Sequence, residues 1–265
     1  MPKAKKIVNY PLVALRGKVI FPATKNLFDA GRLITLTAVS KASERDMTLF
    51  VAYQRDAAKD EIAPQDVCEV GTVVKITQIA KLPSNNLRVS VQGLYRAKAE
   101  EIYEEDGCFY ANVSELKSVH GDPVLEEAYL RTAQDVMRDI ASGDARLAKE
   151  GVSALEKITD PDEYIGEALS VLHIRDDTKQ QLLETVNVVE RFKLFERCLN
   201  DELEISKLER KISATVRRSI DKNQKEYFLR EQLKAIHTEL GDDEEERDTL
   251  SEQIKAKHMP AEIEE

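Results

Sequence analysis

Along the first 118 residues, apolar positions alternate with polar ones or form short runs between Gly, Pro and Asn. Residues 70–79 are rich in Val, Ile and Thr, and residues 87–91 alternate strictly, as a half-buried strand does. Residues 83–86, Pro-Ser-Asn-Asn, have the composition of a tight turn, because Asn tolerates positive φ and Pro fixes its own φ. The pattern predicts a β-hairpin across residues 70–91.

Further strands are predicted in the same region. Residues 48–52 form one apolar run, and residues 96–103 and 108–116 flank a Glu-Glu-Asp-Gly turn. Residues 33–44 allow two interpretations, because their β-branched residues favour a strand while their length and Ser/Lys/Glu-containing end suit a helix. The first 118 residues therefore predict a β-rich lobe.

From Asp122 onward the pattern becomes helical. Asp122 and Asp160 each precede a Pro, which places an N-cap carboxylate before Pro at the first helical position, and Glu163 completes a capping box with Asp160. Residues 142–144, Ser-Gly-Asp, end the first of these helices. Apolar residues recur there at helical spacing and predict one face for a bundle: Val124, Ala128, Tyr129, Ala133, Val136, Met137 and Ile140.

A very long helix is predicted next. No Gly or Pro occurs between Glu167 and Leu240. Residues 176–177, Asp-Asp, can cap one helix within that span, but residues 186–240 contain no stop signal, which gives a helix of ~80 Å at 1.5 Å per residue. Such a helix is too long for a globular core, so it is predicted to protrude. Gly241 ends it, residues 242–246 form an acidic link, and residues 249–258 are helical again.

The apolar positions of this helix suggest how it is used. Four of them, Leu208, Ile212, Val216 and Ile220, are four residues apart, which favours a short helical hairpin over a two-stranded coiled coil. Further along, Leu229, Leu233 and Ile236 form one stripe, whereas Tyr227 and Phe228 lie ~200° and ~100° away from it. One partner helix cannot cover all of them.

Two interpretations of these apolar residues stay open. A hairpin can bury two of the three consecutive residues 227–229 and leave one exposed, or the group can contact unfolded polypeptide or another subunit. Tyr227, Phe228, Leu229 and Leu233 are the candidate substrate-binding residues. A nearby basic cluster, Arg217, Arg218, Lys222 and Lys225, is scattered around the helix among acids, which favours a solvated surface over nucleic-acid binding.

The composition argues against several classes of function. The formal net charge of -10 argues against a dedicated nucleic-acid or anionic-membrane binder, and no run approaches the ~20 apolar residues of a membrane helix. Cys68, Cys108 and Cys198 are far apart and predict reduced thiols of a cytoplasmic protein. The four His residues show no metal-ligand spacing, so no metal site and no cofactor are expected in these residues.

No catalytic residue is predicted either. The chain lacks the G-x-x-x-x-G-K-[ST] phosphate loop and the G-x-S-x-G nucleophile motif. Nothing marks one serine as activated. We expect the 265 residues to hydrolyse neither ATP nor peptides.

Three segments carry a resemblance to the N-terminal region of bacterial Lon-type ATP-dependent proteases. Residues 11–22, from Pro-Leu-Val-Ala-Leu-Arg to Phe-Pro, resemble the opening strand of that domain, and residues 70–96 resemble its central hairpin. Residues 224–241, which include Glu-Tyr-Phe-Leu-Arg-Glu-Gln-Leu-Lys-Ala-Ile, are similar to the helical arm, the most specific of the three. Residues 26–32 depart from the family by placing Asp29 beside Phe28.

The resemblance implies an α+β fold: a PUA-like β pseudo-barrel, then a helical bundle and a long helix. The expected divisions are a β-rich lobe at 1–118, a helical lobe at 119–185, a helical arm at 186–241, and an acidic link with the start of a helical segment at 242–265, before the ATPase module. The implied function of the chain is substrate recognition and oligomerisation. The implied full-length protein is a homo-hexameric ATP-dependent serine endopeptidase with a Ser-Lys dyad, and it uses ATP and magnesium. Its implied substrates are misfolded, damaged and short-lived regulatory proteins. The alternatives are a stand-alone protein- or RNA-binding adaptor and a purely structural oligomerisation arm.

Overall fold

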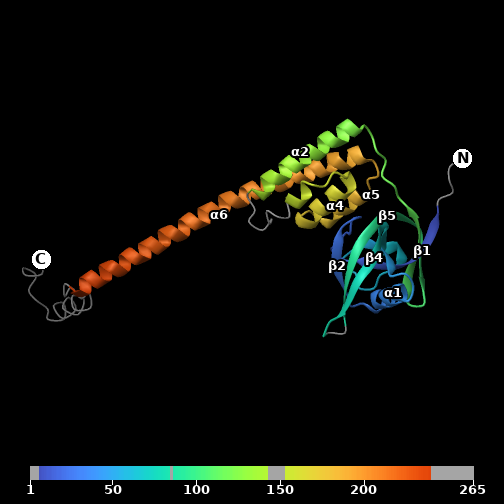
Figure 1. The fold of residues 1–265 in the computed structure, drawn as a ribbon. Coiled ribbons are helices and arrows are strands. Elements are labelled where there is room, and N and C mark those ends of the chain that lie inside the picture. Colours follow the sequence, from blue (N-terminus) through green and yellow to red (C-terminus); the bar gives the residue numbers. More distant parts are fainter. Residues whose placement is uncertain (1–5, 84–85, 143–152, 240–265) are drawn as a thin grey trace, which may run out of the picture. The chain divides into compact units, whose positions relative to one another are not determined.

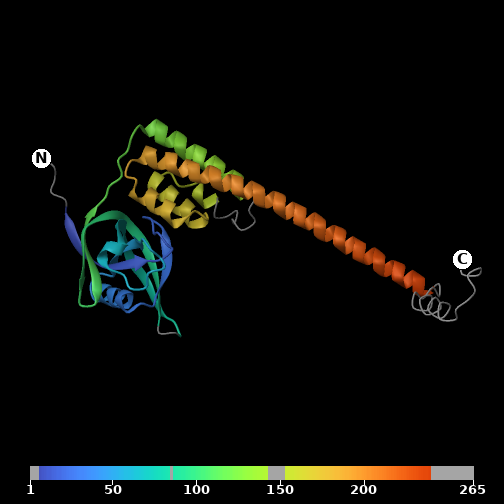
Figure 2. The same cartoon turned by 180° about the vertical axis from the view of Figure 1, so that it is seen from behind.

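A computed structural model of the chain describes residues 6–83, 86–142 and 153–239. The chain divides into two compact units, Met1–Lys207 and Leu208–Glu265. The first unit contains a β-barrel and a helical lobe, and the described part of the second is a single helical segment (Figures 1 and 2). The compact unit thus extends further than the expected end of the helical lobe at residue 185, because the first turns of the last helix pack into it.

The barrel consists of six strands in the spatial order β2-β5-β4-β3-β1-β6, and β6 also pairs with β5. This second pairing closes five strands into a ring. Strand β2 is not part of the ring: it pairs with the first residues of β5, Leu87 to Gln92. All pairings are antiparallel except β1 with β3. The strands are β1 Ile7–Leu15, β2 Lys25–Ala30, β3 Thr48–Gln54, β4 Val67–Lys81, β5 Leu87–Glu105 and β6 Cys108–Glu115.

The closed sheet confirms the β-rich lobe and its hairpin. Strands β4 and β5 pair in antiparallel register from Val70 to Lys81, and the turn residues 84–85 lie outside the described residues. Residues 87–91 and 96–103, which were predicted as separate segments, belong to one strand of 19 residues, β5. Register shifts against β4 and β6 let this strand bend and reach three neighbours.

Two glycines permit close approaches that the barrel requires. A Cβ at Gly71 would lie 2.3 Å from the carbonyl oxygen of Val51, and a Cβ at Gly93 would lie 2.2 Å from that of Phe21. Both distances are far below van der Waals contact. These two glycines belong to the hairpin segment that resembles the Lon domain, so that part of the resemblance has a steric reason.

Residues 33–44, which the sequence left open, form a helix, α1 (Leu33–Ser43). Its buried residues, Thr35, Ala38, Val39 and Ala42, recur at helical spacing. Ala38, Val39 and Ala42 pack with side chains of the strands in one hydrophobic core. Burial of this face therefore outweighs the local β-propensity of the β-branched residues.

The helical lobe contains α2 (Pro123–Ala141), α4 (Pro161–Val171), α5 (Asp176–Glu184) and the start of α6 (Val188–Glu239). Its core includes an offset pair of rings, Tyr129 and Phe192, and an edge-to-face pair, Tyr164 and Phe195. Phe21, from the segment after β1, packs into the same core and so joins the barrel to this lobe.

The predicted N-caps are confirmed. The Asp122 carboxylate accepts a hydrogen bond from the N–H of Val124, and the Asp160 carboxylate accepts one from the N–H of Glu163, which is the Asp160 half of the predicted capping box. By contrast, Asp176 and Asp177 do not cap their helix: Arg175 occupies the N-cap position, and the two acids lie in the first turn. There they still interact favourably with the positive end of the helix.

The predicted bundle face of α2 is partly wrong. Val124 and Ala128 are exposed, and the buried stripe consists of Glu126, Leu130, Ala133, Met137 and Ile140. The stripe includes a carboxylate because Glu126 accepts hydrogen bonds from the His120 ring and from the N–H of Gly121. A helical wheel that scores only apolar residues therefore misses Glu126 and places the face in the wrong phase.

A buried ionic cluster fixes the barrel against the helical lobe. Arg96 on β5 and Arg191 on α6, whose side chains are 4% and 1% exposed, both pair with the carboxylate of Asp162 on α4. The same carboxylate accepts a hydrogen bond from Ser118 in the connecting segment. Arg191 also donates to the carbonyl oxygens of Thr185 and Val186. One carboxylate thus joins three parts of the first unit.

Helix α6 confirms the predicted long helix: it runs for 52 residues, from Val188 to Glu239. Its first turns are held by buried side chains, among them Phe192, Phe195 and Leu199. The predicted end at Gly241, the acidic link and the helix at 249–258 lie outside the described residues. The predicted helical hairpin involves these residues and stays a prediction.

Candidate functional site

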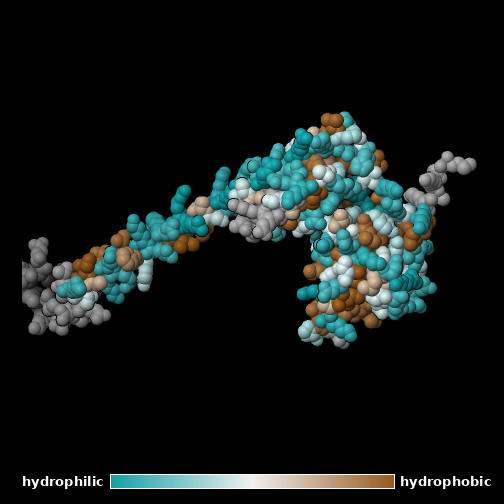
Figure 3. Space-filling model, viewed as in Figure 1, coloured by the Kyte–Doolittle hydropathy of each residue, from teal (hydrophilic) through white to brown (hydrophobic). Residues whose placement is uncertain are grey.

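The predicted site residues lie on α6 in the second unit, where every described residue from 208 to 239 is exposed. Tyr227 is 69% exposed and Phe228 is 61% exposed. Figure 3 shows patches of hydrophobic, brown atoms among mostly hydrophilic ones along this helix. Nine large apolar side chains are exposed along this segment: Leu208, Ile212, Val216, Ile220, Tyr227, Phe228, Leu229, Leu233 and Ile236.

Eight of the nine side chains form two sets along α6, which face opposite sides where they meet near Tyr227 and Leu229, and Phe228 belongs to neither set. At 100° per residue, Leu208 to Ile220 follow a stripe that turns by ~40° every four residues, and Tyr227 lies within ~20° of its end. Leu229, Leu233 and Ile236 lie together on a second side, with Phe228 ~100° from them. A rigid partner helix can cover one set, whereas an extended polypeptide can follow both around the helix. The arrangement is therefore suited to a flexible partner.

A polar segment interrupts the apolar positions of α6 between Ile220 and Tyr227. Residues 221–226 are all polar, and Lys222 pairs with Glu226 at 3.7 Å with both side chains largely exposed. Arg217, Arg218 and Lys225 are exposed as well. Surface ion pairs of this kind contribute little free energy, but they keep a helix with many exposed apolar residues hydrated.

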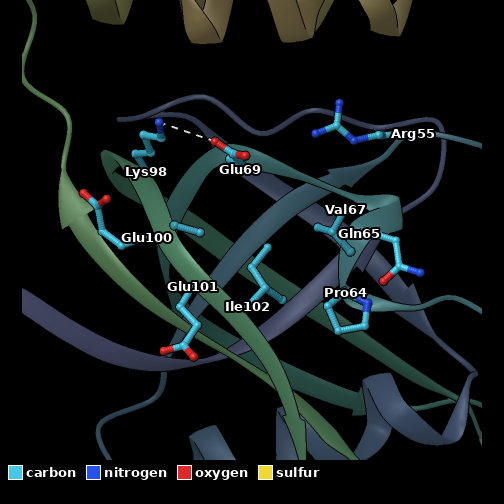
Figure 4. A pocket seen from close by; sticks show the side chains of 10 residues that line it. Arg55, Pro64, Gln65, Val67, Glu69, Lys98, Glu100, Glu101 and Ile102 are labelled. Carbon is cyan, nitrogen blue, oxygen red and sulfur yellow. Dashed lines mark ion pairs between the residues drawn. The ribbon is translucent and has the colours of Figure 1, made fainter.

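The barrel carries a surface cavity of about 490 Å³ beside β4 and β5 (Figure 4). Its charged groups have opposite signs: Lys98 pairs with Glu69 at 3.4 Å, and Arg55 lies across the opening. Glu100 and Glu101 accept hydrogen bonds from Ser114 and Asn112. These partners fix the directions of Lys98, Glu100 and Glu101 at the cavity wall.

The cysteines offer no reactive thiol. Cys68, Cys108 and Cys198 are free and buried, and burial raises the pKa of all three, that of Cys108 to about 11. Such thiols are protonated at neutral pH and therefore poor nucleophiles. Within residues 6–83, 86–142 and 153–239, no group of three or more His, Cys, Asp or Glu could hold a metal ion. No helix in this part of the chain is long and apolar enough to cross a membrane.

Comparison with known proteins identifies the family. Residues 9–201 match the family described as the ATP-dependent protease La (LON) substrate-binding domain. The chain belongs to this family. It is 35% identical over 258 residues to a Lon protease of Clostridioides difficile, covering 94% of this chain and 33% of that protein. It is 34% identical over 261 residues to Lon protease 1 of Bacillus subtilis, covering 96% and 33%.

Solved structures show the same fold. The N-terminal domain of the Mycobacterium avium complex Lon protease superimposes with a TM-score of 0.61 at 20% identity, covering 74% of this chain and 98% of that one. A Lon N-terminal domain protein from Xanthomonas campestris gives 0.51 at 13% identity, covering 72% and 98%. The α+β class predicted for the chain is thereby confirmed. The chain spans about a third of the length of the curated Lon proteases that it matches.

Two features of the first unit escaped the sequence analysis. Arg96 was part of a motif, but its buried pairing with Asp162, which it shares with Arg191, depends on residues up to 95 positions away. A second cavity, next to Lys18 and Arg32, also depends on the fold, because the end of β1, β2, the start of α1 and Asn86 line it together. No local pattern marked either one, although an Arg in an alternating strand was a signal that its charge needs a partner.

Proposed function

We propose that this chain recognises unfolded polypeptide for an ATP-dependent protease of the Lon family. The observation that carries the proposal is the row of large apolar side chains exposed on α6, above all Tyr227 and Phe228. An exposed apolar surface on a chain of net charge -10 binds segments that a folded protein keeps in its core. Membership of a substrate-binding domain family supports the same role.

The wider assignment follows from the family. In the longer protein, ATP hydrolysis with magnesium and a Ser-Lys peptidase would lie outside these 265 residues, and six copies would assemble in the cytoplasm. Misfolded, damaged and short-lived regulatory proteins would be its substrates. This chain would select and hold them, because its described residues contribute binding surfaces and no reactive group.

The test measures how tightly the chain binds an unfolded protein. The variant Tyr227→Ala/Phe228→Ala is compared with Val124→Ala, which removes an equally exposed apolar side chain from α2. Binding of a fluorescent, reduced and alkylated globular protein is followed by anisotropy. Truncation of two aromatic contacts at a binding centre is expected to weaken binding about tenfold or more. The control should bind like the unaltered chain.

Two further measurements separate the alternatives. The melting temperature should stay within about 1 °C of the unaltered value, because neither side chain is buried in the described structure. Sedimentation of each variant gives its oligomeric state. Unchanged binding of the unfolded protein by the double variant contradicts the proposal. If the oligomeric state changes instead, the two residues serve assembly. If the melting temperature falls instead, they belong to the chain's own core. Binding of RNA that survives high salt would favour an adaptor role instead.

A further inference from the structure

A cavity of about 590 Å³ lies where β1 ends, beside β2 and the start of α1. Three basic residues, Arg16, Lys18 and Arg32, line it together with Leu27 and Phe28. Phe28 is buried, whereas Leu27 is 52% exposed at the wall of the cavity. The cavity thus combines positive charge with an accessible apolar side chain.

The charges of this cavity do not cancel. Arg16 pairs with Asp60 at 2.8 Å, and Asp29, the only acid in the lining, is held by Arg88 through two contacts of 2.8 Å. Lys18 and Arg32 have no such partner. Within the described ranges of the chain, neither of them forms an ion pair with a carboxylate.

Neutral oxygens position these two cations. The ammonium of Lys18 donates to the carbonyl oxygen of Leu27 at 2.8 Å. The guanidinium of Arg32 donates to Oε1 of Gln54 at 2.8 Å and to the carbonyl oxygen of Ala14 at 2.6 Å. These hydrogen bonds fix the directions of both side chains and leave their charges uncompensated. An incoming anion would therefore meet preorganised donors.

The helix that begins at this wall adds positive potential. Arg32 is the N-cap of α1, no side chain caps the first turn, and that turn contains no acid. Arg32 and Thr35 both line the cavity. Burial lowers the pKa of Lys18. The pKa of Arg32 is also lowered, mainly by burial and secondly by the charge of Arg16, and the charge of Asp60 opposes this with a smaller effect. These directions fit a site where positive charge lacks a counter-ion.

We propose that this cavity binds a carboxylate of a polypeptide next to an apolar side chain, with Lys18 and Arg32 holding the carboxylate and Leu27 contacting the apolar residue. The carboxylate comes from the C-terminus of a polypeptide or from an Asp or Glu side chain. A polyanion such as RNA fits less well, because the net charge of the chain is -10 and the cavity includes apolar residues. The inference extends the proposed function by naming a chemical feature of the substrate.

The experiment uses the 265-residue chain and three fluorescent nonapeptides without secondary structure. The first ends in Leu with a free carboxylate, the second is the same peptide with a C-terminal amide, and the third is the amide with one internal Asp beside Leu. Anisotropy gives each affinity at low and high salt. We expect the first or the third peptide to bind at least tenfold more tightly than the plain amide, with the difference shrinking at high salt.

Variants locate the effect. Lys18→Gln keeps a hydrogen-bond donor for the Leu27 carbonyl and removes the charge, and Arg32→Gln tests the second cation. Lys25→Gln is the control, since it removes an exposed charge from the start of β2, outside the cavity lining. Lys18→Gln and Arg32→Gln should each remove most of the preference for carboxylate, while Lys25→Gln should keep it. Melting temperatures identify any variant whose fold has changed.

Several results would overturn the inference. One is equal affinity of the chain for all three peptides. Another is an equal loss of the carboxylate preference in Lys18→Gln and Lys25→Gln. A third is displacement of the bound fluorescent peptide by an RNA oligonucleotide at concentrations where the unlabelled peptide does not displace it. Its failure is distinct from failure of the proposed function. Tyr227→Ala/Phe228→Ala alters binding of unfolded protein without touching this cavity, and Lys18→Gln alters the carboxylate preference without touching α6.

Discussion

Replacing Asp162 by Asn should strongly destabilise the first unit. The change keeps the size of the side chain and removes the one negative charge that Arg96 and Arg191 share. Both guanidinium groups are almost completely buried, so water cannot replace the lost partner. The variant therefore leaves two buried cations next to an amide.

The magnitude follows from the burial. Breaking a buried ion pair by removing one partner costs about 3–5 kcal/mol, because the remaining charge stays desolvated. The free energy of unfolding of a natural domain is only about 5–15 kcal/mol. For a unit of this length each kcal/mol lowers the melting temperature by roughly 2–4 °C, so the expected fall is about 6–20 °C. The hydrogen bond from Ser118 to Asp162 changes at the same time and adds to the loss.

Thermal and urea unfolding of the chain, followed by circular dichroism, measures the effect. Asp160→Asn is the matched control: it is the same chemical change at the N-cap of the same helix, Asn caps a helix about as well as Asp, and no ion pair joins Asp160 to either arginine within the described residues, although its charge acts on Arg191 through space. A second comparison introduces Asp162→Asn into an Arg96→Gln background, where it should cost less because one of the two buried cations is already gone. If Asp162→Asn and Asp160→Asn cost the same within about 0.5 kcal/mol, the two arginines do not depend on this carboxylate and the reasoning is wrong.

The remaining predictions concern titration and thiol chemistry. Burial alone would raise the pKa of Glu126, but hydrogen bonds from His120 and from the N–H of Gly121 outweigh it and leave the pKa below its ordinary value of 4.5. Glu126 thus stabilises the fold above pH 4.5, and this stabilisation is lost as the pH falls through the lowered pKa. Glu126→Gln should lower the free energy of unfolding by about 1–2 kcal/mol at pH 7, and this variant should lose less stability on acidification than the unaltered chain. Unfolding measured at several pH values tests this, and the same acid dependence in both proteins would contradict it. The cysteines should react with a neutral alkylating reagent only on unfolding, as intact mass before and after urea would show, and rapid alkylation of the native chain would contradict their burial.

Local sequence signals predicted the elements whose cause is local. Asp122-Pro123 and Asp160-Pro161 mark helix starts because the cap and the fixed φ of Pro act within one turn. The hairpin of β4 and β5 follows from alternation and a turn. The length of α6 follows from the lack of Gly and Pro between residues 167 and 240.

Features that depend on distant residues could not be predicted in this way. Residues 33–44 become a helix only because the strands offer a surface for Ala38 and Ala42. The stripe of α2 shifts because a buried Glu finds its partners outside the helix. The exposure of Tyr227 and Phe228 agrees with one of the two interpretations that their angular spread allowed, and their role in binding stays a prediction. The cavity beside Lys18 and Arg32 was not predictable, because the pattern of residues 14–35 does not show that the end of β1, β2 and the start of α1 line one cavity with Asn86.

Barrel closure has a consequence for synthesis of the chain. Strand β1 is made first, but its antiparallel partner β6 ends 100 residues after β1 does, at Glu115. At about 5–20 residues per second, the ribosome needs roughly 5–20 s to supply that partner. Until then the edge of this apolar strand that β6 will cover has no partner, even after β3 has been made for the other edge, and it is available to other nascent chains. Pro11, in the middle of β1, lacks the N–H that a foreign strand would use, so it limits mispairing during this interval.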